Sequence, residues 1–347
     1  IIRIQDLTGN AYDLGFYNGD YPKRIEINDG DVLISWSASL GVYVWNRGRA
    51  LLNQHIFKVQ FDKVNIDKSY FVYAVRQKLA EMAMKTHGAT MKHIVKKDFE
   101  ETLIPYPSLK KQIEIGTNLD KIDNIIVARK QQLELLDELV KARFVELFGD
   151  AIYNDKGWEN DTVEKLCKEI YGGGTPSKSH PEYYEDGDIP WVSSKDMKTD
   201  VLTDSQIKIN QLGVDNSTAR MVPINSVIMV IRSGILKHTL PVAINAVPIT
   251  VNQDLKVFIP NKRVLTRFLA IQFKMHEKDI LSGVRAVTAD NIEFNSLKQR
   301  ELIVPPIELQ QEYVTFLEQI DKSKVAIQKS LDETKLLFDS LMQEYFG

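Results

Sequence analysis

Two long heptad segments constrain this chain of 347 residues more than any other feature of its sequence. The seam of the first consists of Leu119, Ile122, Ile126, Arg129, Leu133, Leu136, Val140, Arg143 and Leu147. The seam of the second, 198 positions later, consists of Leu317, Ile320, Lys324, Ile327, Leu331, Thr334, Phe338, Leu341 and Tyr345. Alternating steps of three and four residues are typical of a coiled coil. The sequence therefore predicts a doubled chain with two long helices.

Polar residues in the seams show that the two predicted helices are not interchangeable. The unlike pairs are Arg129 with Ile327, Ile126 with Lys324, Leu136 with Thr334, and Arg143 with Leu341. Each polar residue of one helix thus has an apolar counterpart in the other. Because a polar residue in a seam commonly specifies register or orientation, we expect the two helices to pair with each other, antiparallel.

Both predicted helices also begin and end alike. A proline-rich entry precedes each of them, "IPYPSLKKQIEI" at 104–115 and "VPPIELQQEYV" at 304–314, and they end with "FVELFGD" and "LMQEYFG". Proline disfavours helix in the residues before it and suits a first turn, so each entry predicts a strand-to-helix junction. Each helix should have roughly 40 residues and a length of about 60 Å.

The regions between the helices repeat more faintly. "IRIQDL" (2–7) is similar to "VSSKDM" (192–197), "NDGDVLISWSAS" (28–39) to "INSVIMVIRSG" (224–234), and "LLNQHIFKV" (51–59) to "TVNQDLKV" (250–257). These runs are rich in β-branched residues and bounded by turn residues, so we interpret them as strands. The predicted fold class is α/β (α+β), with two similar globules, each followed by a long helix, in a pseudo-two-fold repeat. The chain starts within the first predicted strand and without Met, so we expect its true N-terminus to be missing.

Composition bounds the possible environments and partners. A single cysteine, Cys167, excludes an intrachain disulfide framework and suits a reducing cytoplasm. No run of 18 apolar residues is present, so no membrane span is expected. The net charge of −3 divides into about +2 for 1–107, about 0 for 151–306 and about −5 for the two helical segments together. Nearly neutral globules argue against a generic binder of polyanions but leave locally basic surfaces possible.

Glycine, proline, rings and hydroxyls crowd into one stretch, "GGGTPSKSHPEYYEDGDIPWVSSKDM", from Gly172 to Met197. By itself this is a shaped surface loop. Together with the doubled plan, the "VPP…LQQ" helix entries and the "FG" helix ends, it resembles the DNA-specificity (S) subunit of type I restriction–modification systems. The resemblance covers essentially the whole chain.

The resemblance implies a domain organisation and a function. It implies a first target-recognition domain at 1–107 (N-terminally incomplete), a first long spacer helix at 108–150, a second target-recognition domain at 151–306 and a second spacer helix at 307–347. The two domains would read the halves of a bipartite, asymmetric sequence in double-stranded DNA, whose groove repeats about every 34 Å. The paired helices would act as a spacer and dock two methyltransferase subunits, which restriction and translocase subunits then join. S-adenosylmethionine, ATP and Mg²⁺ would be bound by those partners, and no cofactor by this chain.

Candidate DNA-contacting residues are polar side chains at predicted strand ends and beside glycines, where base edges or phosphates can be reached. In the second domain they are Thr175, Ser177, Lys178, Ser193, Ser194, Lys195, Arg232, Ser233, Lys237, His238, Asn252, Gln253, Arg285 and Thr288. In the first domain they are Arg3, Gln5, Ser35, Trp36, Ser37, Asn53, Gln54, His55, Thr86, His87, Thr90, Lys92 and His93.

Several of these positions have an equally plain structural interpretation. Asn53 and Asn252 stand at strand ends, where capping or a turn competes with base readout. Trp36 and Trp191 also fit a packing role. His180 and His238 have no Cys or His partner at ligand spacing, and His87 and His93 lack an evident third ligand, so no metal site is expected.

The sequence carries no catalytic motif that we recognise. "GGGTPSKS" lacks the spacing and the Gly-Lys pair of a phosphate-binding loop, and "VPPI" is not the Asn/Asp-Pro-Pro motif of amino-methyltransferases. Cys167 lies in an amphipathic stretch and is expected to pack. We therefore predict a non-catalytic recognition subunit. Two alternatives stay open: a coiled-coil scaffold with protein- or glycan-binding globules, and the recognition part of a fused restriction enzyme.

Overall fold

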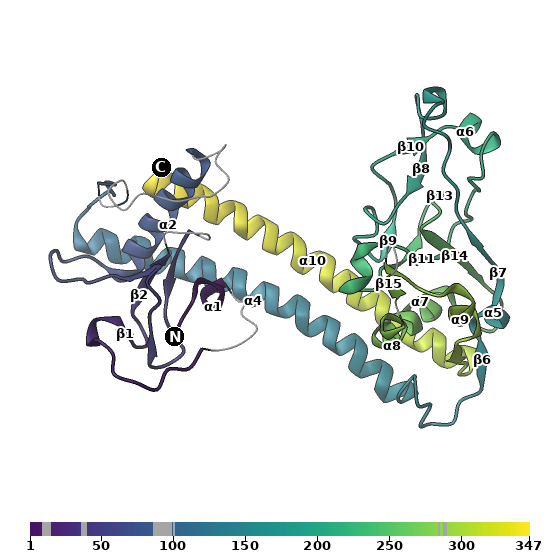
Figure 1. Cartoon of the computed structure of the whole chain (residues 1–347), viewed down its shortest axis with the longest axis horizontal. Helices are drawn as coiled ribbons and strands as arrows, with labels where there is room; N and C mark the ends of the chain where they lie inside the picture. The colour runs from purple at the N-terminus through teal and green to yellow at the C-terminus, as the bar shows by residue number, and fades with distance from the viewer. Residues whose placement is uncertain (9–14, 36–39, 86–98, 100, 284, 287–289) are drawn as a thin grey trace. The chain divides into compact units, whose positions relative to one another are not determined.

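The computed structural model describes residues 1–8, 15–35, 40–85, 99, 101–283, 285–286 and 290–347 (Figure 1). The chain forms two compact units, one of residues 1–133 with 325–347 and one of residues 134–324. The two long helices, α4 (Leu109–Phe148) and α10 (Ile307–Phe346), have 40 residues each, as the heptads predicted. Each unit takes part of both helices, so the predicted division into four sequence domains stays a prediction.

The first unit is a small mixed α/β globule. Its elements are α1 (Ile4–Thr8), η1 (Lys23–Ile25), β1 (Glu26–Ile27), β2 (Val32–Ser35), β3 (Gly41–Val44), β4 (Ala50–Leu51), β5 (Ile56–Lys58) and α2 (Lys68–Lys85). Strand β2 pairs antiparallel with β3 and β5, and β1 pairs with β4. All four residues of β2 are buried: Val32 and Ile34 pack against α2, and Leu33 packs in a second cluster with Ile27 and Trp45.

The start of the chain corrects one prediction. "IRIQDL" is not a strand: only Ile2 makes a bridge, to Leu52, and Ile4–Thr8 is helical. The cause is Asp6, whose carboxylate accepts a hydrogen bond from the Arg3 backbone N–H at 2.7 Å, while its own N–H donates to Arg3 O at 3.0 Å. A carboxylate that binds the backbone three residues back favours a turn over a continued strand.

The second unit is larger and has one continuous core. Its strands are β6 (Asn160–Thr162), β7 (Cys167–Gly172), β8 (Ile189–Val192), β9 (Val201–Leu202), β10 (Lys208–Ile209), β11 (Val227–Val230), β12 (Val242–Asn245), β13 (Thr250–Val251), β14 (Leu255–Pro260), β15 (Arg285–Ala286), β16 (Asp290–Asn291) and β17 (Glu301–Ile303). Its helices are α5 (Val163–Leu166), η2 (Pro181–Tyr183), α6 (Gln211–Asp215), η3 (Gly234–Lys237), α7 (Thr266–Met275), α8 (Glu277–Ser282) and α9 (Phe294–Gln299). A five-stranded sheet in the order β7-β14-β11-β12-β9 lies beside a three-stranded sheet in the order β10-β8-β13.

The core of the second unit forms where α7 packs on the five-stranded sheet. Strand β11 reads Val-Ile-Met-Val and is buried throughout, as expected for a central strand covered on both faces. Phe268 and Phe273 of α7 are fully buried and join the same core. Residues of both long helices close it, including Phe144, Phe148 and Tyr313.

In both units the long helices run antiparallel. In the second unit Arg143 of α4 bonds Glu312 of α10 at 2.7 Å, and Asp137, one and a half turns earlier, bonds Lys324, further along α10. The polar seam residues Arg143 and Lys324 are therefore neutralised by carboxylates of the opposite helix. In the first unit Tyr73 of α2 donates to Asp120 of α4 at 2.8 Å and stacks edge-on against Phe338 of α10.

One packing motif occurs in both units at the predicted offset of 198. Tyr70 of α2 contacts Phe346, at the end of α10, with ring centroids 5.2 Å apart. Phe268 of α7 contacts Phe148, at the end of α4, at 4.9 Å. The apolar ends of the two long helices are thus each buried against α2 or α7, which explains why both helices end in an aromatic residue.

A buried glutamine repeats at the start of each long helix. The Gln310 side chain accepts from the Leu265 backbone N–H at 2.9 Å and donates to Pro305 O at 2.8 Å. Gln112 does the same with Asp67 N at 3.0 Å and Pro107 O at 2.8 Å. Both glutamines are fully buried. This fixes the proline-rich entry of each long helix to the helix α2 or α7 of its own globule.

Candidate nucleic-acid interface

The Gly-rich loop after β7 is held close to the backbone of β13. A Cβ atom on Gly173 would lie 1.9 Å from Val251 O, so only glycine fits there. Gly174 N donates to Val251 O at 3.0 Å, and the indole N–H of Trp191 donates to Gly174 O at 2.9 Å. Trp191 is buried, which supports its packing interpretation. The loop is therefore a fixed segment that carries Thr175 to the exposed turn between β13 and β14.

The turn that follows β8 repeats the turn at the start of the chain. Ser193 N donates to the Asp196 carboxylate at 2.8 Å, as Arg3 N does to Asp6 at 2.7 Å. The residue before each turn forms a parallel bridge with an equivalent partner: Val192 with Val251 in the second unit, and Ile2 with Leu52 in the first. This equivalence supports the alignment of "IRIQDL" with "VSSKDM", although neither run is a continuous strand.

The predicted side chains on this turn differ in accessibility. The Ser193 hydroxyl also donates to Asp196, at 2.8 Å, so it is engaged inside the turn. Ser194 is half-buried and Lys195 is exposed. In the first unit Arg3 is half-buried beside Asp6, at 3.5 Å, and Gln5 is exposed.

The asparagines at the strand ends stabilise turns. Asn252 Oδ1 accepts from Asp254 N at 3.1 Å, and its Nδ2 donates to the Asp254 carboxylate at 3.2 Å. Asn53 Oδ1 accepts from His55 N at 3.2 Å in the equivalent turn. Asn252 is only 7% exposed and Ser35 is fully buried. The sequence analysis predicted that both side chains contact DNA, but neither reaches the surface.

The residues next to these asparagines point outward. Gln253 and Gln54 are exposed, and the Thr175 hydroxyl bonds the Gln253 side chain. Gln54 Nε2 lies 3.4 Å from the His55 ring nitrogen. The two turns thus share a backbone arrangement and differ in the side chains that they present.

Arg232 is at the centre of a polar group beside the turn between β13 and β14 of the second unit. Its Nε and Nη2 atoms each lie 2.6 Å from Asp254 Oδ1, and its side chain is 48% exposed. Ser233 N donates to Asp290 O at 3.1 Å, and the Lys237 ammonium lies 3.6 Å from the Asp290 carboxylate. The ends of β11, β13 and β16 are therefore brought together with their polar side chains.

Lys256 belongs to the same group but was missed in the sequence. Its ammonium lies 4.7 Å from the centroid of the Phe294 ring. Partial burial and, less strongly, the Arg232 charge lower the pKa of Lys256. The alternation of buried Leu255, half-buried Lys256 and buried Val257 in β14 could have indicated that Lys256 faces away from the core.

The remaining predicted residues contribute less to a described surface. Ser177, Lys178 and His238 are exposed, and the Ser177 hydroxyl bonds that of Ser179 at 2.7 Å. Only the backbone of Arg285 is described, paired with Asn291. Trp36, Ser37, Thr86, His87, Thr90, Lys92, His93 and Thr288 lie outside the described residues. Among the described residues no group of three His, Cys, Asp or Glu side chains could hold a metal ion.

Comparison with known proteins identifies the family. The model of the type I restriction modification DNA specificity domain matches twice, at residues 6–136 and 155–334. The chain belongs to this family. Its two matched regions correspond to the two sequence repeats, so the predicted doubled plan and the mixed α/β fold are confirmed.

Curated relatives are specificity subunits. The chain is 32% identical over 232 residues to the type I restriction enzyme EcoR124I/EcoR124II specificity subunit of Escherichia coli, over 65% of this chain and 56% of that protein. It is thus aligned with less than two thirds of that relative. It is 23% identical to the MjaIX specificity subunit of Methanocaldococcus jannaschii, over 90% of this chain and 76% of that protein.

A solved structure supports the fold. The S subunit of a type I restriction-modification system from M. genitalium is 14% identical, with a TM-score of 0.59, over 92% of this chain and 83% of that chain. At this identity the likeness concerns the fold alone.

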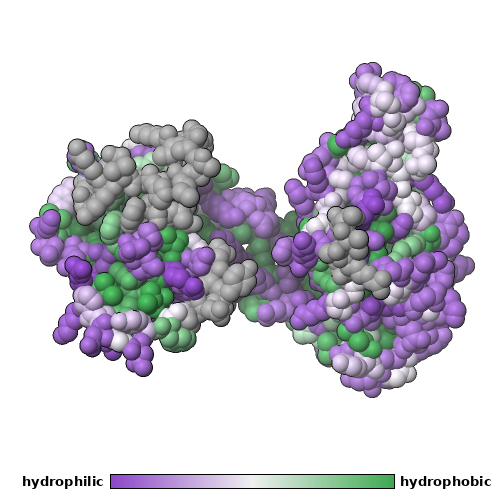
Figure 2. Space-filling model, viewed as in Figure 1, coloured by the Kyte–Doolittle hydropathy of each residue, from purple (hydrophilic) through white to green (hydrophobic). Residues whose placement is uncertain are grey.

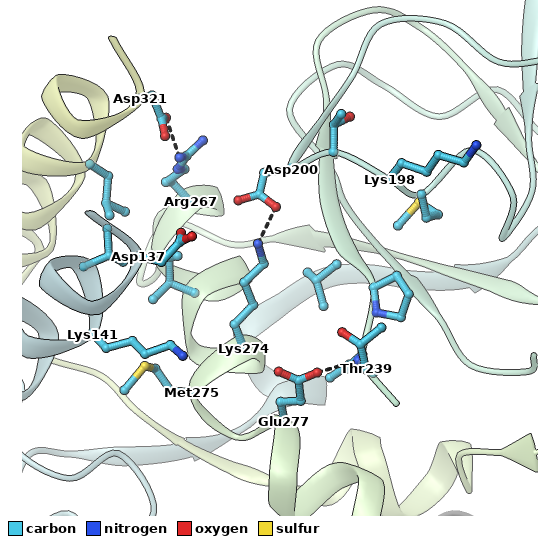
Figure 3. A pocket seen from close by; sticks show the side chains of 18 of the residues that line it. Asp137, Lys141, Lys198, Asp200, Thr239, Arg267, Lys274, Met275, Glu277 and Asp321 are labelled. Atoms are coloured by element: carbon cyan, nitrogen blue, oxygen red, sulfur yellow. Dashed lines mark hydrogen bonds and ion pairs between the residues drawn. The ribbon is translucent and has the colours of Figure 1, made fainter. Parts of the chain in front are cut away.

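The second unit also holds a cavity of about 810 Å³ (Figure 3). Helices α4, α7 and α10 and the segments at 197–200 and 239–242 line it. Figure 3 shows Lys274 directed at Asp200 and Arg267 at Asp321, both at 2.5 Å. Two basic residues of the cavity, Lys274 and Arg267, are thus paired with carboxylates.

The visible face of the second unit and the exposed surface of the long helices differ in polarity. Hydrophilic residues cover most of the visible face of the second unit, with smaller apolar patches between them (Figure 2). On the long helices, by contrast, Val325, Leu336 and Leu337 are more than half exposed. No helix in the described part of the chain is long and apolar enough to cross a bilayer.

Proposed function

We propose that this chain recognises a bipartite sequence in double-stranded DNA as part of a type I restriction–modification complex, with one half of the sequence read by each unit. One observation carries the proposal: the same scaffold occurs twice with different side chains at its tip. In both units a parallel bridge leads into a turn closed by an aspartate, next to a turn closed by an asparagine.

The tip residues differ in a way that suits an asymmetric target. Gln253 and Asp254 of the second unit correspond to Gln54 and His55 of the first. A carboxylate that orients an arginine and an imidazole present different donors and acceptors to a groove. Two copies of one scaffold would therefore read two unlike half-sites.

The chain acts in this proposal without catalysing a reaction. Methyltransferase subunits would dock on the long helices, where Val325, Leu336 and Leu337 are exposed. Those partners and the restriction and translocase subunits would carry S-adenosylmethionine, ATP and Mg²⁺. The complex would act in the cytoplasm, where the single Cys167 stays reduced.

A gel-shift titration tests the proposal. The target duplex is first defined by sequencing the methylated bases of a host that expresses this chain with the methyltransferase encoded beside it. We expect a bipartite motif, tight binding of that duplex by the assembled complex, and weak binding by this chain alone because its globules are nearly neutral.

A scrambled duplex of the same length is the control for non-specific binding. Equal affinity of the complex for the scrambled and the target duplex would contradict sequence recognition. Nanomolar specific binding by the isolated chain would contradict the need for partners. A protein or glycan ligand bound with no affinity for either duplex would favour the scaffold alternative.

A further inference from the structure

Arg232 stands where three segments of the second unit converge. Its backbone N–H and that of Ile231 donate to Asp254 O, at 3.2 and 2.9 Å, and Arg232 forms an antiparallel bridge with Asn291. The Cα atom of Arg232 is thus fixed on one side by the β13–β14 turn and on the other by β16. An exposed arginine rarely has its main chain held so completely outside a regular strand.

The guanidinium group is fixed as well. Asp254 Oδ1 accepts a hydrogen bond from Nε of Arg232 at 2.6 Å, and Nη2 lies 2.6 Å from the same oxygen in the ion pair. The other oxygen of Asp254 accepts from Asn252, which is 7% exposed and whose own N–H donates to Val192 O at 2.9 Å. A chain of hydrogen bonds therefore runs from the buried end of β8 to an exposed guanidinium.

A guanidinium has five N–H donors; Nε–H donates to Asp254, and Nη2 lies at ion-pair distance from the same carboxylate oxygen. The end of the guanidinium away from Asp254 keeps one N–H of Nη1 and one N–H of Nη2, a parallel pair that matches O6 and N7 of guanine in the major groove. The side chain is 48% exposed, so this pair is accessible.

We propose that Arg232, oriented by Asp254, is the residue that reads a guanine in the half-site bound by the second unit. The inference rests on the proposed function, and adds to it the base and the residue that specifies it. Arg232 contacts the base directly, whereas Asp254 and Asn252 are positioning residues.

The charge of the group favours a base over a phosphate as the ligand of Arg232. The ion pair with Asp254 is neutral overall, so it contributes little to phosphate neutralisation, yet it keeps its directional donors. Lys256 is the better phosphate ligand, since within the described residues no carboxylate bonds its ammonium. An arginine already held in one conformation also loses less side-chain entropy on binding.

The sequence of the first unit has no arginine and no carboxylate at the positions that correspond to Arg232 and Asp254. By the register of the sheets, Ser35 opposite Ile56 corresponds to Val230 opposite Leu255. The positions of Arg232 and Asp254 are thus taken by Ser37, which lies outside the described residues, and His55. The two half-sites should accordingly differ in whether an arginine reads a guanine.

The first experiment determines the methylated motif of the full complex, with this chain unsubstituted or carrying Arg232→Ala or Asp254→Asn. We expect one invariant guanine of the second half-site to become degenerate with both variants, while the first half-site is unchanged. Asp254→Asn is the sharper variant, because it removes a negative charge. Electrostatics alone would strengthen binding to every duplex, whereas loss of orientation lowers discrimination.

The second experiment replaces that guanine by 7-deazaguanine, which lacks the N7 acceptor, and measures binding by the assembled complex. The unsubstituted complex should bind the 7-deazaguanine duplex about 5- to 150-fold more weakly than the guanine duplex, because the two-bond contact is lost wholly or in large part. The Arg232→Ala complex should lose less than about 2-fold, because the contact is already absent.

Arg263→Lys is the matched control. Arg263 also pairs with carboxylates and is 40% exposed, but it follows the far end of β14, about 20 Å along the strand. It should leave the motif unchanged. Thermal unfolding of each variant shows that the fold is kept.

Three results overturn the inference while leaving the proposed function intact: a second half-site without guanine, an unchanged motif with Arg232→Ala, or an equal loss of affinity for all duplexes with that variant. A complex that methylates no bipartite motif would contradict the proposed function itself, and the inference with it.

Discussion

The buried glutamine that joins each long helix to its globule provides the sharpest test of the fold. Gln310 makes three hydrogen bonds, with Leu265 N at 2.9 Å, Arg263 O at 3.0 Å and Pro305 O at 2.8 Å. A buried hydrogen bond contributes about 1 kcal/mol net, and an unsatisfied backbone group that remains costs about 1–3 kcal/mol. Gln310→Ala should therefore lower the free energy of unfolding by about 3 kcal/mol.

The glutamate variant separates hydrogen bonding from packing. Gln310→Glu keeps the size of the side chain but loses the donors to Arg263 O and Pro305 O, and it buries a carboxylate beside these oxygens. We expect it to destabilise the chain at least as much as alanine does. Gln328→Ala is the control, since Gln328 is exposed on the same helix and bonds only Asp332 among the described residues; it should change stability by less than about 0.5 kcal/mol.

Hydrogen exchange with peptide resolution is the assay, because a chain with two compact units is not expected to unfold in one step. Gln310→Ala should accelerate exchange in the peptide that covers 262–275. Gln112→Ala should do so in the peptide that covers 64–75, around its partner Asp67. The reasoning would be refuted if Gln310→Ala matched Gln328→Ala, or if both buried glutamines affected the same peptide.

Two further predictions concern the second unit. Gly173→Ala should abolish specific DNA binding and expose the loop to proteolysis, because its Cβ would lie 1.9 Å from Val251 O; Gly234→Ala, with no atom within 4 Å of its Cβ, should be tolerated in the same assays. Burial, with a smaller effect of Arg300, lowers the pKa of His276 to about 4. As the pH falls from about 6.5 to 4, His276 is protonated in the unfolded state but stays neutral in the folded state. About 2–3 kcal/mol of the free energy of unfolding should therefore be lost over that range. Hydrogen exchange of peptides from the second unit at pH 7 and pH 5, corrected for the intrinsic exchange rates, measures the loss, and His276→Gln should flatten it; an equal pH dependence in that variant would assign it to other groups.

The long helices and the internal repeat could be predicted because their signals are local and occur twice. Leu119 and Leu317 belong to heptads that any coiled-coil helix of this length requires, and both are fully buried. The strands β2 and β11 were readable from β-branched runs bounded by turn residues. The opening "IRIQDL" was misread because its periodicity is compatible with a strand, whereas the Asp6 carboxylate turns the chain.

The candidate interface could be predicted only as a set of strand ends. Asn252 and Gln253 are adjacent and both carry a side-chain amide, yet Asn252 closes a turn from inside and Gln253 is exposed. Spacing does not distinguish them, since the outcome depends on which side of the turn meets β8 and the Gly-rich loop.

The sequence by itself determined that this chain is doubled, that each half includes a long helix, and that polar side chains follow the predicted strands. Only the tertiary structure decided that Arg232 meets Asp254, 22 residues later, and that Gln310 holds both Leu265 and Pro305. Periodicity acts over a few residues and survives in the linear order. A hydrogen bond between distant segments depends on the register in which sheets and helices pack, and that register is set by the whole core.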